Sequence, residues 1–279
     1  MIAPRQAVGL IAPIELPHTG SPRAGAPCLV VDTRRPDAYI ESHIPSAINL
    51  YAGAFVDPRR GLVPTVEDIA DRLGNAGIAR DSRLLLYDDG AGAYAGGLLW
   101  LLDRVAHPNL ALVDGGISAW YAQGGALDRD MAEHAARPYI VGSGVDRHDN
   151  LATKDWILRN MARDDVLMVD TRSEAEYHGR TPSALRNGHI PGAVRLEWTE
   201  CLDHGEGRAP RYVTTVEMRP KLAALGITDD KEIVCYCQAG TRSEQVYGVL
   251  RMMGFPRVRN YRASWADWGN DPHTPIQTD

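Results

Sequence analysis

Two stretches of the chain decide its fold: LVVDTRRPDAYIESHIPSA at residues 29–47 and LMVDTRSEAEYHGRTPSALRNGHIPGA at residues 167–193. Each begins with an apolar run that ends in Asp-Thr-Arg, places a tyrosine (Tyr39 or Tyr177) seven residues after the aspartate, and then reaches His-Ile-Pro. The second copy has eight additional residues between its tyrosine and its histidine. Such self-similarity indicates a repeated structural unit.

The repetition continues outward from these stretches. Residues 83–102 (RLLLYDDGAGAYAGGLLWLL) and 112–120 (LVDGGISAW) are matched by residues 232–250 (EIVCYCQAGTRSEQVYGVL) and 258–268 (VRNYRASWADW). The spacing is also kept, since 32 residues separate Asp88 from Trp120 and 31 separate Cys237 from Trp268. We therefore predict a duplicated domain, with copies at residues 1–136 and 148–279 and a linker at residues 137–147.

Each copy alternates short apolar runs with helical stretches. The runs before Asp88 and Cys237 have strand length and polar flanks, as buried parallel strands do. Residues 65–78 and 214–227 both open with threonine, carry apolar residues at helical spacing and stop at a glycine. Strands that alternate with helices predict an α/β fold, in which each domain is a mainly parallel sheet flanked by helices on both faces.

Composition limits the possible partners. The 279 residues carry a formal net charge of −6, which disfavours binding to nucleic acid or to an anionic membrane surface. The sequence contains no run of about 18 apolar residues, so we expect no membrane span. The four cysteines (Cys28, Cys201, Cys235 and Cys237) form neither a CxxC motif nor a Cys/His cluster. We expect no metal site and a reducing, cytoplasmic location.

The loop Cys237-Gln-Ala-Gly-Thr-Arg242 carries the predicted chemistry. It follows a strand and precedes a helix, so backbone N–H groups and the helix dipole converge on its first residue. A sulfur at that position is favoured as a thiolate or as the anionic outer sulfur of a persulfide. Gly240 permits the turn that this arrangement needs. Cys235, inside the strand, and Cys28, before one, match inert core cysteines instead.

These motifs together resemble the tandem-domain rhodanese family, and the loop that begins Cys-Gln and ends in Arg is most similar to its bacterial thiosulfate sulfurtransferases. The resemblance implies two rhodanese-like domains, a catalytic second one and an inactive first one, and Asp88 stands in place of Cys237 accordingly. It implies Cys237 as the catalytic residue and Gln238, Ala239, Gly240 and Thr241 as the active-site loop. Arg242 and Arg186 become candidate anion-binding residues, and Trp198 a candidate aromatic wall near the sulfur.

Arginine also suits a dianionic donor by its own chemistry, because its planar guanidinium can donate hydrogen bonds to two oxygens of one oxyanion. Asp170 and Arg172 are interpreted as a structural contact, since Asp32 and Arg34 repeat it in the inactive copy. His43 and His189 repeat in the same way and are also interpreted as structural.

The predicted reaction is a double displacement in which Cys237 takes sulfur from a small anionic donor and passes it to cyanide or a thiol, with no cofactor and in a monomer. Thiosulfate is the expected donor, and 3-mercaptopyruvate remains an alternative because Gln238-Ala239 replaces the basic or Gly-Ser-Gly sequences of other members. A cysteine phosphatase is disfavoured, since four residues rather than five separate Cys237 from Arg242. A redox-sensing or binding module is disfavoured by the presence of Cys237.

Overall fold

The structure is a computed structural model that describes residues 11–14, 28–55, 63–142 and 150–278. The chain divides into two compact units: unit 1 comprises Met1–Arg147 and Asp203–Tyr212, and unit 2 comprises His148–Leu202 and Val213–Asp279. The sequence had placed residues 203–212 within the second domain. Residues 143–147 of the predicted linker, and the two residues after them, lie outside the described residues.

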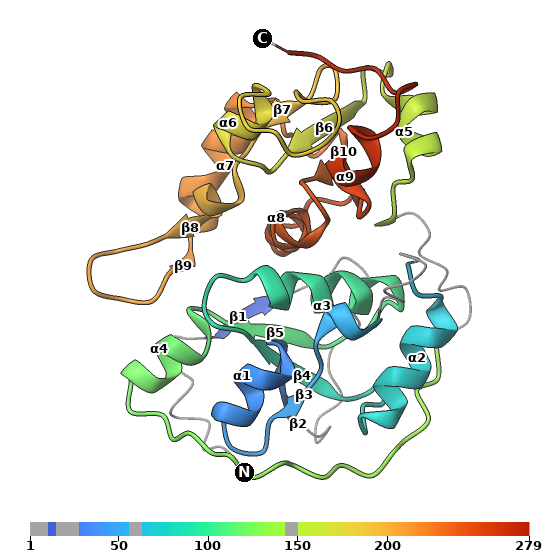
Figure 1. The fold of residues 1–279 in the computed structure, drawn as a ribbon. Coiled ribbons are helices and arrows are strands. Elements are labelled where there is room, and N and C mark those ends of the chain that lie inside the picture. The colour runs from blue at the N-terminus through green and yellow to red at the C-terminus, as the bar shows by residue number, and fades with distance from the viewer. Residues whose placement is uncertain (1–10, 15–27, 56–62, 143–149, 279) are drawn as a thin grey trace. The chain divides into compact units, whose positions relative to one another are not determined.

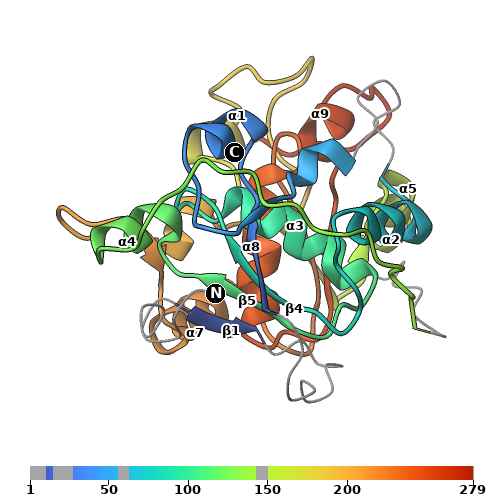
Figure 2. The same ribbon diagram turned by 90° about the horizontal axis from the view of Figure 1, so that it is seen from below.

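Unit 1 contains a sheet in the order β1-β5-β4-β2-β3, with β1 antiparallel to β5 and the other neighbours parallel. Figure 2 shows β1, β5 and β4 side by side. The strands are β1 (Ile11–Ile14), β2 (Cys28–Asp32), β3 (Ile48–Asn49), β4 (Arg83–Tyr87) and β5 (Leu110–Val113). The helices are α1 (Pro36–Glu41), η2 (Ala52–Phe55), α2 (Val66–Asn75), α3 (Ala93–Arg104) and α4 (Gly116–Ala122).

Helices cover both faces of this sheet. Tyr39 of α1 and Trp120 of α4 pack with Val30 and Val113 of the strands in one buried cluster. Helix α3 lies on the opposite side of the strands (Figure 1). Its apolar residues are buried almost all round, as expected for a helix enclosed in the structure.

Unit 2 repeats this plan with a wholly parallel sheet in the order β11-β10-β6-β7. Its strands are β6 (Val166–Asp170), β7 (Val194–Arg195), β10 (Glu232–Tyr236) and β11 (Val258–Asn260). A separate pair of strands, β8 (Leu202–Asp203) and β9 (Arg211–Tyr212), belongs to the segment that is assigned to unit 1 from Asp203 on. Its helices are α5 (Lys154–Asn160), α6 (Glu174–Tyr177), η4 (Trp198–Cys201), α7 (Thr215–Ala224), α8 (Thr241–Met252) and α9 (Ser264–Trp268).

The two faces of the unit 2 sheet are again covered by different helices. Trp265 and Trp268 of α9 pack with Val234 and Tyr236 in one buried cluster. The alternate residues of β10 point to the other face, where α8 packs on β10 and β11 (Figure 1). The predicted mainly parallel α/β architecture is confirmed in both units.

Both predicted helices that open with threonine are present. Thr65 caps α2 and Thr214 caps α7, each in a capping box with an acidic residue three positions on. Among the described residues, no helix is both long and apolar enough to cross a membrane.

A buried ion pair recurs at the same place in each unit. The Arg172 guanidinium donates to both carboxylate oxygens of Asp170, at 2.9 and 2.6 Å, and to the carbonyl of Gly188 at 2.7 Å. Arg34 repeats this with Asp32, at 3.0 and 2.6 Å, and with the carbonyl of Ser42. The predicted structural reading of these pairs is confirmed, because each joins the end of a strand to the segment before His-Ile-Pro.

The repeated tyrosines and histidines form a second shared contact. Tyr39 stacks on His43 with ring centroids 4.0 Å apart, and Tyr177 stacks on His189 at 3.7 Å. Each tyrosine hydroxyl donates to the carbonyl of the alanine that follows His-Ile-Pro, at 2.8 and 2.7 Å. Both histidines are therefore structural, as the sequence predicted.

We expect Asp170→Asn to lower the free energy of unfolding by about 3–5 kcal/mol, because it leaves the fully buried Arg172 charge without its counter-ion. Urea unfolding of the purified variant measures this loss. Asp165→Asn is the matched control, since Asp165 pairs with Arg163 at the surface, where an ion pair contributes about 0–1 kcal/mol. Equal effects of the two substitutions would contradict the structural role of the buried pair.

Candidate active site

Cys237 directly follows β10, a central strand of the unit 2 sheet, and lies four residues before α8 begins. Residues 233–236 of β10 are buried completely, and this holds the strand in the interior up to the cysteine. Cys237 itself is 1% exposed. The position is the carboxyl edge of a parallel sheet, where ligands bind in open α/β folds.

The backbone around Cys237 is fixed by the segment that enters α9. The N–H of Cys237 donates to the Ser264 hydroxyl at 3.1 Å, and the Trp265 N–H donates to the Cys237 carbonyl at 3.0 Å. The next carbonyl, that of Gln238, accepts from the Ala266 N–H at 2.9 Å. The cysteine is therefore held on both sides by a segment that lies almost thirty residues later in the chain.

One backbone amide of the loop donates to the sulfur. The Gly240 N–H donates to the Cys237 Sγ at 3.1 Å, and the Ser264 hydroxyl lies 3.9 Å from the same atom. Gly240 has a φ of +100°, and a Cβ on it would lie 2.8 Å from the Arg262 carbonyl oxygen. A larger residue would therefore push the loop away from the sulfur.

Ser264 is a site residue that the sequence analysis missed. Its φ is +55°, which costs about 1–2 kcal/mol for a residue with a Cβ, and such strain gathers at functional sites. The equivalent residue of unit 1 is Gly116, which has a φ of +58°. The two positions correspond because the Ile117 N–H donates to the Asp88 carbonyl as the Trp265 N–H donates to the Cys237 carbonyl. Alignment of the two copies could have identified this residue, because the copy with the cysteine has Ser264 where the other copy has Gly116.

Arg242 is the second residue of α8, and it is held by a residue that the sequence analysis did not select. Its guanidinium donates to both carboxylate oxygens of Glu176 in α6, at 2.7 and 2.8 Å. The Glu176 hydrogen bonds are the largest cause of the raised pKa of Arg242, and they outweigh the opposing effect of burial. The negative charge of a Cys237 thiolate would raise the pKa of Arg242 further, so the guanidinium lies within electrostatic reach of the sulfur.

Glu176 is ionised over the whole physiological range. Burial alone would raise its pKa, but hydrogen bonds from Arg242 and from Ser173 outweigh burial and lower the pKa to about 2. Glu176 closes the capping box of α6 with Ser173 at the same time. One carboxylate therefore caps a helix and holds the loop arginine.

Arg186 makes a different set of contacts from those expected of an anion-binding residue. Its guanidinium donates to the carbonyls of Trp268, Asp271 and Thr274, and to the Thr274 hydroxyl at 2.6 Å. These bonds fasten the additional residues of the second copy to the C-terminal segment. No contact among the described residues joins Arg186 to Cys237, so its role in binding substrate stays a prediction.

The other predicted residues of the site lie in the loop itself, apart from Trp198. The Gln238 side-chain amide donates to the Ser183 carbonyl at 2.8 Å, while its Oε1 is buried without a hydrogen-bond partner. Ala239 and Thr241 are exposed. Trp198 is half-buried at the start of η4, a segment that packs on α8. Its predicted role as a wall near the sulfur stays a prediction.

Two of the remaining cysteines have surroundings that suppress thiolate formation, and the third lies in unit 1. Burial raises the pKa of Cys201 to about 12, and complete burial raises the pKa of Cys235 further. Cys28 is the exposed first residue of β2 in unit 1, so its interpretation as a core cysteine before a strand is wrong. Within the described residues, no group of His, Cys, Asp or Glu could hold a metal ion.

In unit 1 the corresponding loop encloses a carboxylate. Asp88 accepts backbone N–H groups of Gly90, Gly92 and Ala95, at 2.8, 3.2 and 3.2 Å. Burial and the nearby Asp89 raise the pKa of Asp88, and the three amides oppose that shift. The loop of the first copy thus retains converging amides around an anion that cannot form a persulfide.

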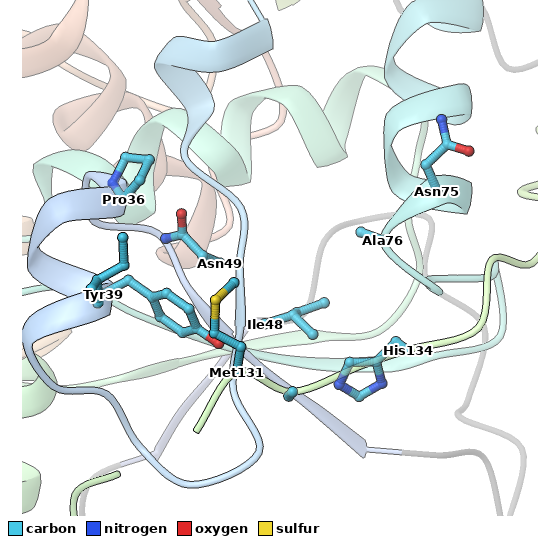
Figure 3. A pocket seen from close by; sticks show the side chains of 10 residues that line it. Pro36, Tyr39, Ile48, Asn49, Asn75, Ala76, Met131 and His134 are labelled. Carbon is cyan, nitrogen blue, oxygen red and sulfur yellow. The ribbon is translucent and has the colours of Figure 1, made fainter. Parts of the chain in front are cut away.

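Unit 1 also contains an open pocket of about 350 Å³ between α1, the end of α2 and residues 131–134 (Figure 3). Tyr39, Ile48, Asn75, Met131 and His134 are among its lining residues. None of its lining residues belongs to the Cys237 loop, so the pocket is separate from the candidate site.

Comparison with known proteins places this geometry in a family. The model of the rhodanese-like domain matches residues 19–123 and again residues 153–271. The chain is 37% identical over 266 residues to a thiosulfate sulfurtransferase of Azotobacter vinelandii, covering 91% of this chain and 93% of that protein. It is 36% identical over 272 residues to a thiosulfate sulfurtransferase of Pseudomonas aeruginosa, covering 94% and 95%.

A solved structure has the same fold. The anaerobic ergothioneine biosynthesis enzyme of Chlorobium limicola superposes with a TM-score of 0.79 at 24% identity, over 95% of this chain and 66% of that longer one. The likeness supports the fold alone. Two matches to one domain model, with relatives above 30% identity over nearly the whole chain, show that this chain belongs to the rhodanese family.

Proposed function

We propose that this chain is a thiosulfate sulfurtransferase that carries the transferred sulfur as a persulfide on Cys237. The observation that carries the proposal is the position of the Cys237 sulfur. It lies in the loop between β10 and α8, accepts the Gly240 N–H at 3.1 Å, and is followed by Arg242 in the first turn of that helix. The names of the relatives support the same activity.

In the first step the Cys237 thiolate attacks the outer sulfur of thiosulfate. A sulfur–sulfur bond forms to Cys237, the bond inside thiosulfate breaks, and its electron pair leaves with sulfite. Three negative charges are present before and after this step. The product is an anionic persulfide, which the Gly240 amide and the helix N-terminus stabilise.

In the second step cyanide or a thiolate attacks the outer sulfur of the persulfide. Thiocyanate or a new persulfide leaves, and Cys237 returns as a thiolate. The surroundings of the sulfur provide hydrogen-bond donors rather than a general base, and a thiolate needs no base to act as a nucleophile.

Thiosulfate is favoured over 3-mercaptopyruvate as the donor because two relatives that match nearly the whole chain are named thiosulfate sulfurtransferases. We further propose that Trp198 and Arg186 border the substrate and that the protein acts as a cytoplasmic monomer. Four cysteines without a disulfide among the described residues support a reducing compartment.

Cys237→Ser is expected to abolish sulfur transfer from thiosulfate to cyanide, whereas Cys28→Ser, Cys201→Ser and Cys235→Ser keep most of it. The raised pKa of Cys201 and of Cys235 keeps those thiols protonated, and the thiolate is the nucleophile. Mass spectrometry after thiosulfate treatment should find one added sulfur, about 32 Da, on the peptide that contains Cys237. Added sulfur on Cys201 instead would overturn the assignment.

Arg242→Ala is expected to lower kcat/KM for thiosulfate by about 10–100-fold, the effect of losing a charge-assisted contact of ~1.5–3 kcal/mol. Arg180→Ala is the matched control, because Arg180 lies at the surface and pairs with Glu174. Steady-state rates with thiosulfate and 3-mercaptopyruvate, measured side by side, test the donor at the same time. A wild-type preference for 3-mercaptopyruvate would refute the donor while leaving the persulfide chemistry in place.

A further inference from the structure

The guanidinium of Arg242, which lies five residues after Cys237 in the first turn of α8, is paired with a carboxylate. Both terminal nitrogens donate to Glu176, at 2.7 and 2.8 Å, so the fork that would hold an oxyanion is already occupied by a side chain. The Glu176 side chain is 13% exposed and that of Arg242 is 26% exposed, which limits screening by water. The pair has a fixed geometry and a net charge near zero.

Glu176 is itself held rigidly. It lies in α6, directly after the Asp-Thr-Arg segment that the buried Asp170–Arg172 pair fixes. Its Oε2 also accepts from the Ser173 backbone N–H and from the Ser173 hydroxyl, at 3.1 and 2.9 Å. The Ser173 N–H, the Ser173 hydroxyl and the Arg242 guanidinium all donate to this carboxylate, which is therefore held in one position. The fixed carboxylate in turn fixes the position of the Arg242 guanidinium.

The pair is present only in the copy that has the cysteine. Ala38 of unit 1 corresponds to Glu176, because each precedes the stacked tyrosine by one residue. Tyr94 is the second residue of α3, as Arg242 is of α8. The Asp–Arg pair and the Tyr–His stack occur in both units and therefore serve the fold, whereas the Glu176–Arg242 pair is dispensable to the fold of unit 1.

Two other arginines of unit 2 are paired with carboxylates in the same way. Arg262, next to the Gly240 turn, pairs with the buried Glu244 at 2.9 Å. Arg195, at the end of β7, pairs with Glu200 at 2.9 Å. Removing the Glu176 carboxylate would therefore change the local charge by one unit, because the charges of the other two arginines are already balanced by their own carboxylates.

We propose that Glu176 is a positioning residue that holds Arg242 beside the Cys237 sulfur and, by neutralising it, sets the preference of the site between dianionic and monoanionic sulfur donors. The proposal rests on the sulfur transfer proposed above, and it adds two separable effects. The position of Arg242 acts on kcat, because the guanidinium stabilises the sulfur as charge moves onto it. The charge of Glu176 acts on donor selection, because a dianion responds to it more than a monoanion does.

The experiment compares thiosulfate with methanethiosulfonate, which presents the same outer sulfur with one negative charge fewer. Attack by Cys237 on either donor gives the same persulfide, and the leaving groups are sulfite and methanesulfinate. Both donors are assayed with cyanide as acceptor, in the full-length wild-type chain and in three variants: Glu176→Gln, Glu176→Asp and Glu174→Gln. Glu174 is the matched control, since it lies on the same helix, is 61% exposed and pairs with Arg180 instead.

Glu176→Gln should lower kcat about tenfold with both donors, because Arg242 is no longer held, while the ratio of the methanethiosulfonate KM to the thiosulfate KM rises about fivefold. Glu176→Asp keeps the charge but cannot span both nitrogens in the same way. It should lower kcat and leave the KM ratio at the wild-type value. Glu174→Gln should change neither quantity. A Glu176→Gln enzyme that behaves as Glu174→Gln does would overturn the proposal.

A measurement that needs no sulfur donor separates this proposal from the proposed function. The alkylation rate of Cys237 by iodoacetate, an anion, is divided by its rate with neutral iodoacetamide, with modification of Cys237 followed by mass spectrometry. The ratio should rise about fivefold in Glu176→Gln and stay unchanged in Glu176→Asp and Glu174→Gln. If the wild type transfers no sulfur but this ratio rises, the proposed function fails and the role of Glu176 stands. If the wild type is active and the ratio is unchanged, the role of Glu176 fails alone.

Discussion

The buried ion pair between Asp170 and Arg172 connects the parts of unit 2 on which the site depends. The carboxylate lies at the end of β6, and the guanidinium reaches the Gly188 carbonyl before His-Ile-Pro and the face of Trp265, 4.4 Å away, at the start of α9. Helix α9 in turn fixes the backbone of Cys237. Because a buried charge without its partner is costly, these segments have one stable arrangement.

The two copies separate what the fold requires from what the chemistry requires. Both retain the Asp–Arg pair, the Tyr–His stack and a loop after the central strand in which backbone N–H groups donate to the side chain at its first position, three to Asp88 and one to Cys237. Only the second has a sulfur in that loop, a serine hydroxyl near it and a carboxylate–arginine pair beside it. In the first copy a buried aspartate occupies the loop, so its amides are satisfied internally.

Around the sulfur, positive charge is present but paired. The site attracts an anion mainly through oriented dipoles, with Arg242 adding a guanidinium whose charge Glu176 offsets. Such an arrangement would stabilise the small anionic persulfide of the proposed mechanism, because oriented dipoles act over a short range. An acidic protein can therefore hold an anionic intermediate in one restricted place.

The sequence by itself determined the duplication, the α/β class, the capped helices and the place of Cys237 between a strand and a helix, because these depend on local patterns: strand runs, threonine caps and a cysteine placed before a glycine turn. The tertiary structure alone decided the partners of the arginines. Arg186 meets carbonyls more than eighty residues away, and Arg242 meets Glu176 across 66 residues. Ser264 reaches the sulfur through a positive φ that only its packing imposes. Contacts between segments this far apart follow from how strands and helices pack, and residue spacing along the chain does not encode them.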